Sequence, residues 1–223
     1  MKTFHPFYLV ALPQFIAQFI ALELPIFNFD CYLCTMIRYY ENIDISERNS
    51  FHVRQVAKRL VEFDRAEELP ELFERYGSES WYVLSGGNNI LFTKDVEPLL
   101  ITPCDDRIEV ISESETAVRV KVGAGVEWDD LVAWSVEREL WGIENLSAIP
   151  SSVGAAPVQN IGAYGAEAKD AISVVEYFDT NKLEVVRLKN EECSFAYRES
   201  VFKHELKGVA IILAVEFELH RTA

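Results

Sequence analysis

Polar and hydrophobic positions alternate over several short stretches of this chain, which is the pattern of β-strands with one buried face. The clearest case is residues 117–122, where Val118, Val120 and Val122 alternate with two basic side chains. One face of that strand is therefore expected to be buried and the other solvated. Runs of β-branched and aromatic residues bounded by turn residues predict further strands at residues 53–61, 81–84, 90–92, 99–102, 108–112, 172–179, 183–188 and 209–219.

Two stretches instead have hydrophobic residues at helical spacing. The first covers residues 65–76, has Pro70 in its first turn and ends at Gly77, as helices commonly begin and end. The second covers residues 128–139. Large aromatic residues at this spacing belong to a core more often than to a cofactor site. The hydrophobic positions are Leu69, Leu72 and Phe73 in the first helix, and Trp128, Leu131, Val132 and Val136 in the second.

Residues 149–165 fit neither pattern and are too long for an ordinary turn. They contain three glycines, two prolines and several other small residues, with almost no charge. Long connections in compact domains are usually functional or disordered, and the interleaved hydrophobic residues argue against disorder. Small residues let the backbone approach a ligand closely, and a polar cofactor can bond buried backbone amides. The stretch is interpreted as a loop that wraps a cofactor; a well-packed crossover without a ligand is the alternative.

A second glycine-rich segment, residues 85–89 (Ser-Gly-Gly-Asn-Asn), stands between two predicted strands. Its spacing alone favours a hairpin turn. The functional alternative is a nest of backbone amides that binds a phosphate group. Neither a P-loop nor a GxGxxG dinucleotide motif is present, so the sequence does not support nucleotide binding of those kinds.

Composition narrows the function further. The net charge of -15 argues against a nucleic-acid partner, because phosphate binding needs clustered Lys and Arg. The cysteines are Cys31, Cys34, Cys104 and Cys193, and Cys31 and Cys34 have the spacing of a redox pair or half a zinc site. No second close pair of ligands completes a zinc site, so no metal is expected. Nothing indicates a disulfide framework, which favours a reducing compartment.

The N-terminal residues have a different character. Residues 4–29 are strongly apolar but are interrupted by Pro13 and Pro25. Three interpretations compete: a membrane anchor, a secretory signal, or a stretch outside the functional fold. We expect the native start to be Met36, with residues 1–35 as an N-terminal extension from an over-extended reading frame. Residues 36–50 are polar and aromatic without a clear period and are predicted to be a lead-in.

Four motifs, in order along the chain, resemble one enzyme family. Residues 49–51 (Asn-Ser-Phe) resemble its Asn-Thr-Phe, and residues 84–91 are similar to its Gly-x-Gly-Ser-Asn-x-Leu loop. Residues 142–165 form the most specific match, and residues 195–203 resemble its Tyr-Arg-(Asp/Glu)-Ser-x-Phe-Lys. The family is that of the UDP-N-acetylenolpyruvoylglucosamine reductases, also called UDP-N-acetylmuramate dehydrogenases. The resemblance covers about residues 49–219.

The resemblance implies an α+β FAD-binding fold of the vanillyl-alcohol-oxidase (PCMH) type. A small mixed αβ subdomain (about residues 51–105) would be followed by a larger antiparallel sheet with helices (106–221), with FAD between them. It also implies a cytoplasmic monomer that works in peptidoglycan synthesis, and so in cell-wall biogenesis, cell shape, the cell cycle and cell division. NADPH would reduce FAD, and reduced FAD would reduce UDP-GlcNAc-enolpyruvate; neither nucleic acid nor membrane would be a partner.

The same resemblance implies roles for individual residues. Arg198 matches the catalytic arginine that holds the substrate carboxylate and stabilises enolate charge, a role suited to a planar bidentate donor. Tyr197 beside it would bind substrate near the flavin. The residues expected to bind FAD are Ser85, Gly86, Gly87, Asn88, Asn89, Ser151, Ser152, Val153, Gly154, Asn160, Ile161, Gly162, Ala163, Tyr164 and Gly165.

The family's proton-donating serine and its catalytic glutamate lie in a C-terminal substrate domain whose motifs the sequence does not contain. We therefore expect a truncated reductase; the alternative is a stand-alone FAD-binding module without full catalysis. A third hypothesis, another flavin oxidase with a covalently attached flavin, is weaker. His52 and His204 lie outside the glycine-rich loops where an attachment histidine is expected.

Overall fold

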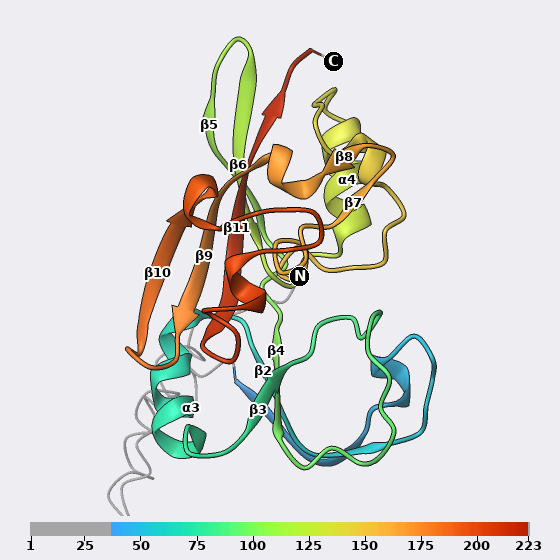
Figure 1. Cartoon of the computed structure of the whole chain (residues 1–223), viewed down its shortest axis with the longest axis vertical. Coiled ribbons are helices and arrows are strands. Elements are labelled where there is room, and N and C mark those ends of the chain that lie inside the picture. The colour runs from blue at the N-terminus through green and yellow to red at the C-terminus, as the bar shows by residue number, and fades with distance from the viewer. Residues whose placement is uncertain (1–36, 223) are drawn as a thin grey trace, which may run out of the picture. The chain divides into compact units, whose positions relative to one another are not determined.

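The computed structural model describes residues 37–222, which belong to one compact unit of the chain. Two β-sheets form the framework of this unit (Figure 1). The apolar stretch at residues 4–29, the Cys31–Cys34 pair and the expected start at Met36 lie outside the described residues. No helix within residues 37–222 is long and apolar enough to cross a membrane.

The smaller sheet is mixed, with strand order β1-β2-β4-β3. β1 pairs antiparallel with β2, whereas β2 and β3 both run parallel to β4. The hydrophobic side of α3 packs on this sheet, and Gly77 follows its last residue, as predicted. The elements are β1 (Arg38–Asp44), β2 (Val56–Phe63), α3 (Leu69–Tyr76), β3 (Trp81–Val83) and β4 (Leu99–Pro103).

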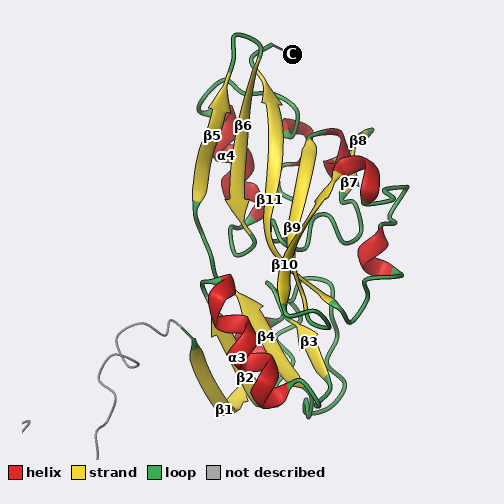
Figure 2. Ribbon diagram, turned by 90° about the vertical axis from the view of Figure 1, so that its left-hand side faces the viewer, coloured by secondary structure: helices red, strands yellow, loops and turns green. Residues whose placement is uncertain are grey.

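The larger sheet is antiparallel throughout, with strand order β10-β9-β11-β6-β5 (Figure 2). α4 packs on one face of it, where the Trp128 and Phe217 rings lie 5.9 Å apart. The helix ends at Val136, earlier than predicted, and Val136 is exposed rather than buried. The elements are β5 (Ile108–Glu113), β6 (Ala117–Gly123), α4 (Trp128–Val136), β9 (Ile172–Asp179), β10 (Glu184–Lys189) and β11 (Ala210–His220).

The alternation at residues 117–122 is confirmed, because the three valines of β6 are buried in the main core. The opposite face of the sheet carries ion pairs, Lys121 with Glu176 at 2.8 Å and Arg119 with Glu216 at 2.9 Å. Two-faced strands of this kind are what the period-2 pattern encodes. The predicted α+β architecture, a small mixed sheet and a larger antiparallel one, is therefore present.

Three local predictions were wrong. Residues 90–92 form no strand, and residues 85–89 are not a hairpin turn, since β3 is parallel to its neighbour β4. Residues 36–50 contain β1, which is an edge strand of the smaller sheet. Most β1 side chains are exposed on both faces, so the strand carries no alternating pattern that the sequence could reveal.

The stretch at residues 149–165 packs on the same face of the larger sheet as α4. Val153, Ala156 and Ile161 are buried in one core with α4 and β11. A short hairpin, β7 (Gly162–Ala163) and β8 (Ala166–Glu167), closes the stretch. Six short 3-10 helices complete the described residues: Ser46–Arg48, Ala66–Glu68, Glu144–Leu146, Ala168–Asp170, Asn190–Glu192 and Val201–Lys203.

Candidate functional site

Residues 85–89, directly after β3, present backbone amides that the protein leaves unbonded. The N–H of Leu84 still donates to Ile101 O at 2.9 Å, but no described residue accepts a hydrogen bond from any N–H of residues 85–89. The carbonyl oxygens of Gly87 and Asn88, in contrast, accept bonds from the N–H and the hydroxyl of Ser50, both at 3.3 Å. Successive free amides of this kind form an anion-binding concavity.

The shape of this loop depends on its glycines and on the Asn-Ser-Phe motif at residues 49–51. Gly87 has a φ of +65°, and a Cβ on it would lie 2.0 Å from Arg48 O. The supporting segment is fixed by Asn49, whose buried amide donates to Ile45 O at 2.8 Å and accepts from Val53 N at 3.1 Å. The Asn-Ser-Phe motif therefore holds residues 85–89 in place.

Residues 151–154 contact the same loop. The hydroxyls of Ser85 and Ser152 are 2.5 Å apart, although the two residues are far apart in sequence. A Cβ on Gly154 would lie 2.7 Å from the Cβ of Ala124, so the chain passes too closely there for a larger residue. Val153 is buried in the core, and so only its backbone can face a ligand.

Many amides of residues 149–165 are bonded within the protein rather than left for a ligand. Val153 N donates to Val126 O at 2.8 Å, Gly154 N to Ala124 O at 3.0 Å and Ile161 N to Ala156 O at 3.1 Å. Much of this backbone is satisfied by the protein itself. Residues 85–89, where sequence spacing favoured an ordinary turn, leave all five of their amides unbonded among the described residues.

Asn160 organises the second half of the stretch. Its side chain is 1% exposed. The amide donates to Ala196 O at 3.0 Å and to Glu167 Oε2 at 3.2 Å, and its oxygen accepts from Lys169 N at 3.0 Å. One buried amide thus joins the stretch to β8, to the residues after it and to the segment that carries Arg198.

Tyr164 and Gly165 form the turn of the β7–β8 hairpin, with positive φ at both residues. This geometry is that of the tight turns favoured in hairpins. Tyr164 is 91% exposed, so its ring is available to a ligand or to solvent. Ile161, in contrast, is buried in the core and can offer only its backbone.

Tyr197 and Arg198 occupy a tight turn closed by the mutual backbone bonds of Ala196 and Glu199, both 3.1 Å. Arg198 has a φ of +57°, and its carbonyl oxygen accepts a bond from Lys203 Nζ at 2.7 Å. Its guanidinium donates to Gly162 O at 2.8 Å. The arginine is thereby fixed against β7, the strand that contains the predicted flavin-binding Gly162.

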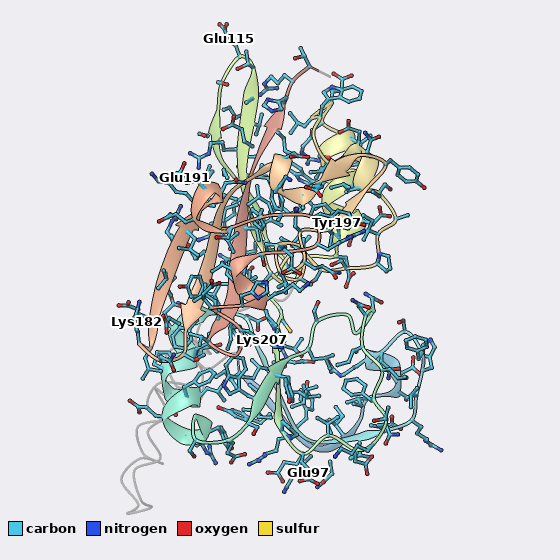
Figure 3. All side chains as sticks on the ribbon, in the orientation of Figure 1. Glu97, Glu115, Lys182, Glu191, Tyr197 and Lys207 are labelled. Atoms are coloured by element: carbon cyan, nitrogen blue, oxygen red, sulfur yellow. The ribbon has the colours of Figure 1, made fainter. Side chains whose placement is uncertain are left out.

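A pocket of about 530 Å³ lies between the β7–β8 hairpin and this turn, and Asn160, Tyr164, Tyr197 and Arg198 are among its lining residues. Figure 3 shows Tyr197 on the side of the molecule that carries β7 and β8. Tyr197 is 79% exposed, whereas Arg198 is half-buried. The two residues predicted to bind substrate therefore stand together at one cavity.

Arg198 has no carboxylate within ion-pair distance among the described residues, although Glu167 lies close enough to sense its charge. Within residues 37–222, only Arg75 and Arg198 among the arginines have no carboxylate within ion-pair distance. Arg75 is exposed on the surface of α3 and so is solvated. A half-buried guanidinium without an ion-pair partner has donors free to bind an anion, as the sequence predicts for Arg198.

Two carboxylates stand near Arg198. Hydrogen bonding to Lys169, then to Asn160, with the charge of Arg198 as a smaller cause, holds the pKa of Glu167 below its usual value. Lys203, followed by His204, lowers the pKa of Glu199 in the same way. Both groups are therefore ionised near neutral pH and cannot donate a proton there.

The structure thus brings the predicted residues together in two groups. Residues 85–89 and 151–154 form the first, joined by the Ser85–Ser152 bond. Residues 160–165 and 197–198 form the second, joined through Asn160 and Arg198. Sequence reasoning missed Glu127, whose carboxyl stands beside Gly86, because a single acidic residue before a helix carries no specific signal.

Two cysteines lie among residues 37–222, outside the two groups of predicted site residues. Cys104 and Cys193 have free thiols, and burial, then the charge of Glu192, raises the pKa of Cys193 to about 12. In the part of the chain that the structure describes, no group of three or more His, Cys, Asp or Glu side chains could hold a metal ion.

Comparisons with known proteins agree with this arrangement. Residues 57–188 match the model of the family described as FAD binding domain. UDP-N-acetylenolpyruvoylglucosamine reductase of Flavobacterium johnsoniae is 38% identical over 178 residues, which are 80% of this chain and 53% of that protein. The enzyme of the same name from Neisseria meningitidis serogroup B is 41% identical over 185 residues, 82% of this chain and 53% of that protein. The resemblance noted from the motifs is therefore confirmed, and the chain spans about half the length of these relatives.

Solved structures show the same fold. The UDP-N-acetylenolpyruvylglucosamine reductase of Thermus caldophilus superposes with a TM-score of 0.67 at 23% identity, covering 85% of this chain and 64% of that one. The 6-hydroxy-D-nicotine oxidase of Arthrobacter nicotinovorans superposes with a TM-score of 0.60 at 16% identity, covering 84% of this chain and 43% of that one. At these identities the likeness concerns the fold alone.

Proposed function

The chain belongs to the FAD binding domain family, and from that premise we propose that residues 37–222 form the flavin-binding part of an NADPH-dependent UDP-N-acetylenolpyruvoylglucosamine reductase. Such a protein reduces UDP-GlcNAc-enolpyruvate to UDP-N-acetylmuramate during peptidoglycan synthesis. The relatives' names support the substrate class, and the FAD-binding family supports the cofactor. NADPH as the reductant rests on the motif resemblance.

The residues present fit FAD. The unbonded N–H groups of residues 85–89 offer several donors to a diphosphate, and Ser85 and Ser152 add hydroxyls at its edge. Gly87 and Gly154 let two backbone segments approach more closely than any residue with a Cβ allows. When bound, FAD would supply hydride chemistry between NADPH and the enolpyruvyl double bond.

Arg198 carries the proposal for the substrate. It is the one half-buried arginine without a carboxylate at ion-pair distance among the described residues. It lines a pocket beside residues 160–165, which are proposed to bind the flavin. In a chain of net charge -15, an anion needs such a local cation to bind. A planar guanidinium can hold the substrate carboxylate in a fixed orientation and stabilise negative charge as it develops.

The proton for the second half of the reaction does not come from the neighbours of Arg198. Glu167 and Glu199 have lowered pKa values, so each is ionised and acts as a hydrogen-bond acceptor. Their contribution is structural, because Glu199 holds Lys203, which in turn bonds the carbonyl oxygen of Arg198. Glu167 and Glu199 therefore bind and orient, and the proton for turnover must come from a group other than these two carboxylates.

A binding experiment tests the proposal. The full chain is purified, freed of ligand and titrated with FAD, with flavin fluorescence as the readout. We expect saturable binding of one FAD per chain, followed by a change in the flavin absorption spectrum when UDP-GlcNAc-enolpyruvate is added. Binding of FAD without any spectral response to the sugar nucleotide would contradict the substrate assignment. Absence of FAD binding by a folded chain would contradict the proposal as a whole.

A further inference from the structure

Lys203 stands behind the turn that carries Arg198 and has no assigned part in ligand binding. Its ammonium group donates to the carbonyl oxygen of Arg198 at 2.7 Å and to Glu199 Oε1 at 3.1 Å. The other carboxyl oxygen of Glu199 is 2.5 Å from His204 Nε2. Both acceptors of Lys203 therefore belong to the turn, and Lys203 is not among the residues that line the pocket.

The base from which Lys203 extends is fixed to the core. Lys203 ends a short 3-10 helix in which Phe202 is 6% exposed, and the Phe202 ring lies 5.9 Å from that of Tyr177 in β9. Ser200 precedes this helix and is 1% exposed. Its hydroxyl donates to Val158 O at 2.6 Å and accepts from Phe202 N at 3.2 Å. Because the interior is closely packed, the start of the Lys203 side chain has little freedom to move.

The arginine turn itself has far less support. Ala196 and Tyr197 are exposed, and Arg198 has a φ of +57°, a conformation that is unfavourable for a residue with a Cβ. Two side chains hold the carbonyl oxygens of this turn: Asn160 bonds that of Ala196, and Lys203 bonds that of Arg198. A charged donor makes a stronger hydrogen bond than a neutral one, so the bond from Lys203 offsets the backbone cost at Arg198.

We propose that Lys203 is a positioning residue, which keeps the backbone of Arg198 left-handed and thereby keeps the guanidinium on Gly162 O at the pocket. The inference rests on the proposed binding of the substrate carboxylate by Arg198. Allowed side-chain rotamers depend on the backbone, so a turn that relaxes to the commoner negative φ carries the guanidinium away from β7. Lys203 acts on the substrate through Arg198 and not by contact.

Three single variants of the full chain separate this role from general stability. Lys203→Met removes the donor but keeps a long side chain, and Lys203→Arg restores a positively charged donor. Lys207→Met is the matched control, because Lys207 (Figure 3) is exposed and its side chain makes no hydrogen bond or ion pair with a described residue. Thermal melting confirms that the original chain and the three variants are folded.

The first measurement does not depend on substrate. Phenylglyoxal, which modifies arginine side chains, is applied to each protein with FAD present, and peptide mass mapping gives the rate at Arg198 relative to the exposed Arg75. In the original chain Arg198 should react more slowly than Arg75, because it is half-buried and bonded to Gly162 O. Lys203→Met should raise the rate at Arg198 about threefold or more, because the turn has lost a bond that holds it. Lys203→Arg and Lys207→Met should leave that rate close to the original.

The second measurement compares two dissociation constants. That for UDP-GlcNAc-enolpyruvate is taken from the change in flavin absorption, and that for FAD from flavin fluorescence. Lys203→Met should weaken binding of the sugar nucleotide about tenfold, which is the worth of one charge-assisted hydrogen bond, and should leave FAD affinity unchanged. Lys203→Arg should restore most of the lost affinity. A lysine that only stabilises the fold would move both constants or neither.

Three results would overturn the inference. Arg198 might prove no more reactive in Lys203→Met than in Lys207→Met, which would show that the turn holds its conformation alone. Equal behaviour of Lys203→Arg and Lys203→Met would show that the donated bond is irrelevant, and equal loss of affinity for FAD and for the sugar nucleotide would show a general structural role. If no folded protein gives a spectral response to the sugar nucleotide, the substrate assignment fails instead, and the phenylglyoxal rates still decide whether Lys203 positions Arg198.

Discussion

Replacing Asn160 tests how the flavin-binding stretch and the arginine turn are held together. Its buried side chain makes three hydrogen bonds, to Glu167, Ala196 and Lys169, at 3.0–3.2 Å. Its backbone has a φ of +44°, a conformation that costs an alanine about 1–2 kcal/mol and a glycine nothing. Asn160→Gly therefore measures the hydrogen bonds alone, and Asn160→Ala adds the backbone cost.

The magnitudes follow from these contacts. Three hydrogen bonds at about 1 kcal/mol each amount to about 3 kcal/mol, and water reaching the half-buried Lys169 amide offsets part of this. We expect Asn160→Gly to lower the free energy of unfolding by about 2–3 kcal/mol and Asn160→Ala by about 3–5 kcal/mol. A domain of ordinary stability, about 5–15 kcal/mol, stays folded in both cases.

Urea denaturation with linear extrapolation is the assay, and an unchanged slope shows that the unfolding reaction is the same. Asn42 supplies the control, because it is exposed, has a φ of +50° and makes no side-chain hydrogen bond with a described residue. Asn42→Ala and Asn42→Gly should differ by the same backbone cost, while Asn42→Gly itself should cost little. If Asn160→Gly proves no more destabilising than Asn42→Gly, the argument that Asn160 joins the two segments is refuted.

Three further changes test the site and the smaller sheet. Gly87→Ala should abolish FAD binding, because its Cβ would meet Arg48 O at 2.0 Å; retained affinity in a flavin titration would contradict the loop geometry. Arg198→Lys should eliminate the spectral response to substrate and any turnover while sparing FAD binding, whereas equal loss of both would show that the arginine is structural. Burial opposes ionisation of Glu62, but its bonds to Arg38 and Arg48 lower its pKa overall, so its contribution to stability is lost as the pH falls through the folded-state pKa. Glu62→Gln should therefore lose less stability than the original chain between about pH 5 and pH 3 in acid-dependent urea melts, and parallel curves would count against this.

Much of the secondary structure follows from local pattern. The valines of β6 alternate with basic residues, and α3 repeats hydrophobic residues at helical spacing, because each element has one face buried and one face wet. Periodicity did not reveal the strand that lacks one buried and one solvated face. β1 is exposed on most positions of both faces, so its residues resembled a lead-in.

The candidate site was likewise predictable only in part from the sequence. The motifs alone pointed to Arg198, Tyr197 and the glycine-rich segments, and the pocket brings several of these residues together. Which segment offers free amides was not predictable. Residues 85–89 follow a strand that pairs in parallel with β4, so no partner strand returns to bond them. The amides of residues 149–165 were expected to need a ligand, but many of them donate to carbonyl oxygens of the protein itself.

Most elements and their buried faces were predictable from side-chain periodicity, because periodicity is a local property of the chain. Which groups meet depends on the folded chain: Ser85 contacts Ser152 across 67 positions, and Arg198 contacts Gly162 across 36. It also decided that Arg198 remains unpaired and that Glu127 faces the loop. Those outcomes depend on how strands are ordered and how closely loops pack, and no local pattern encodes them.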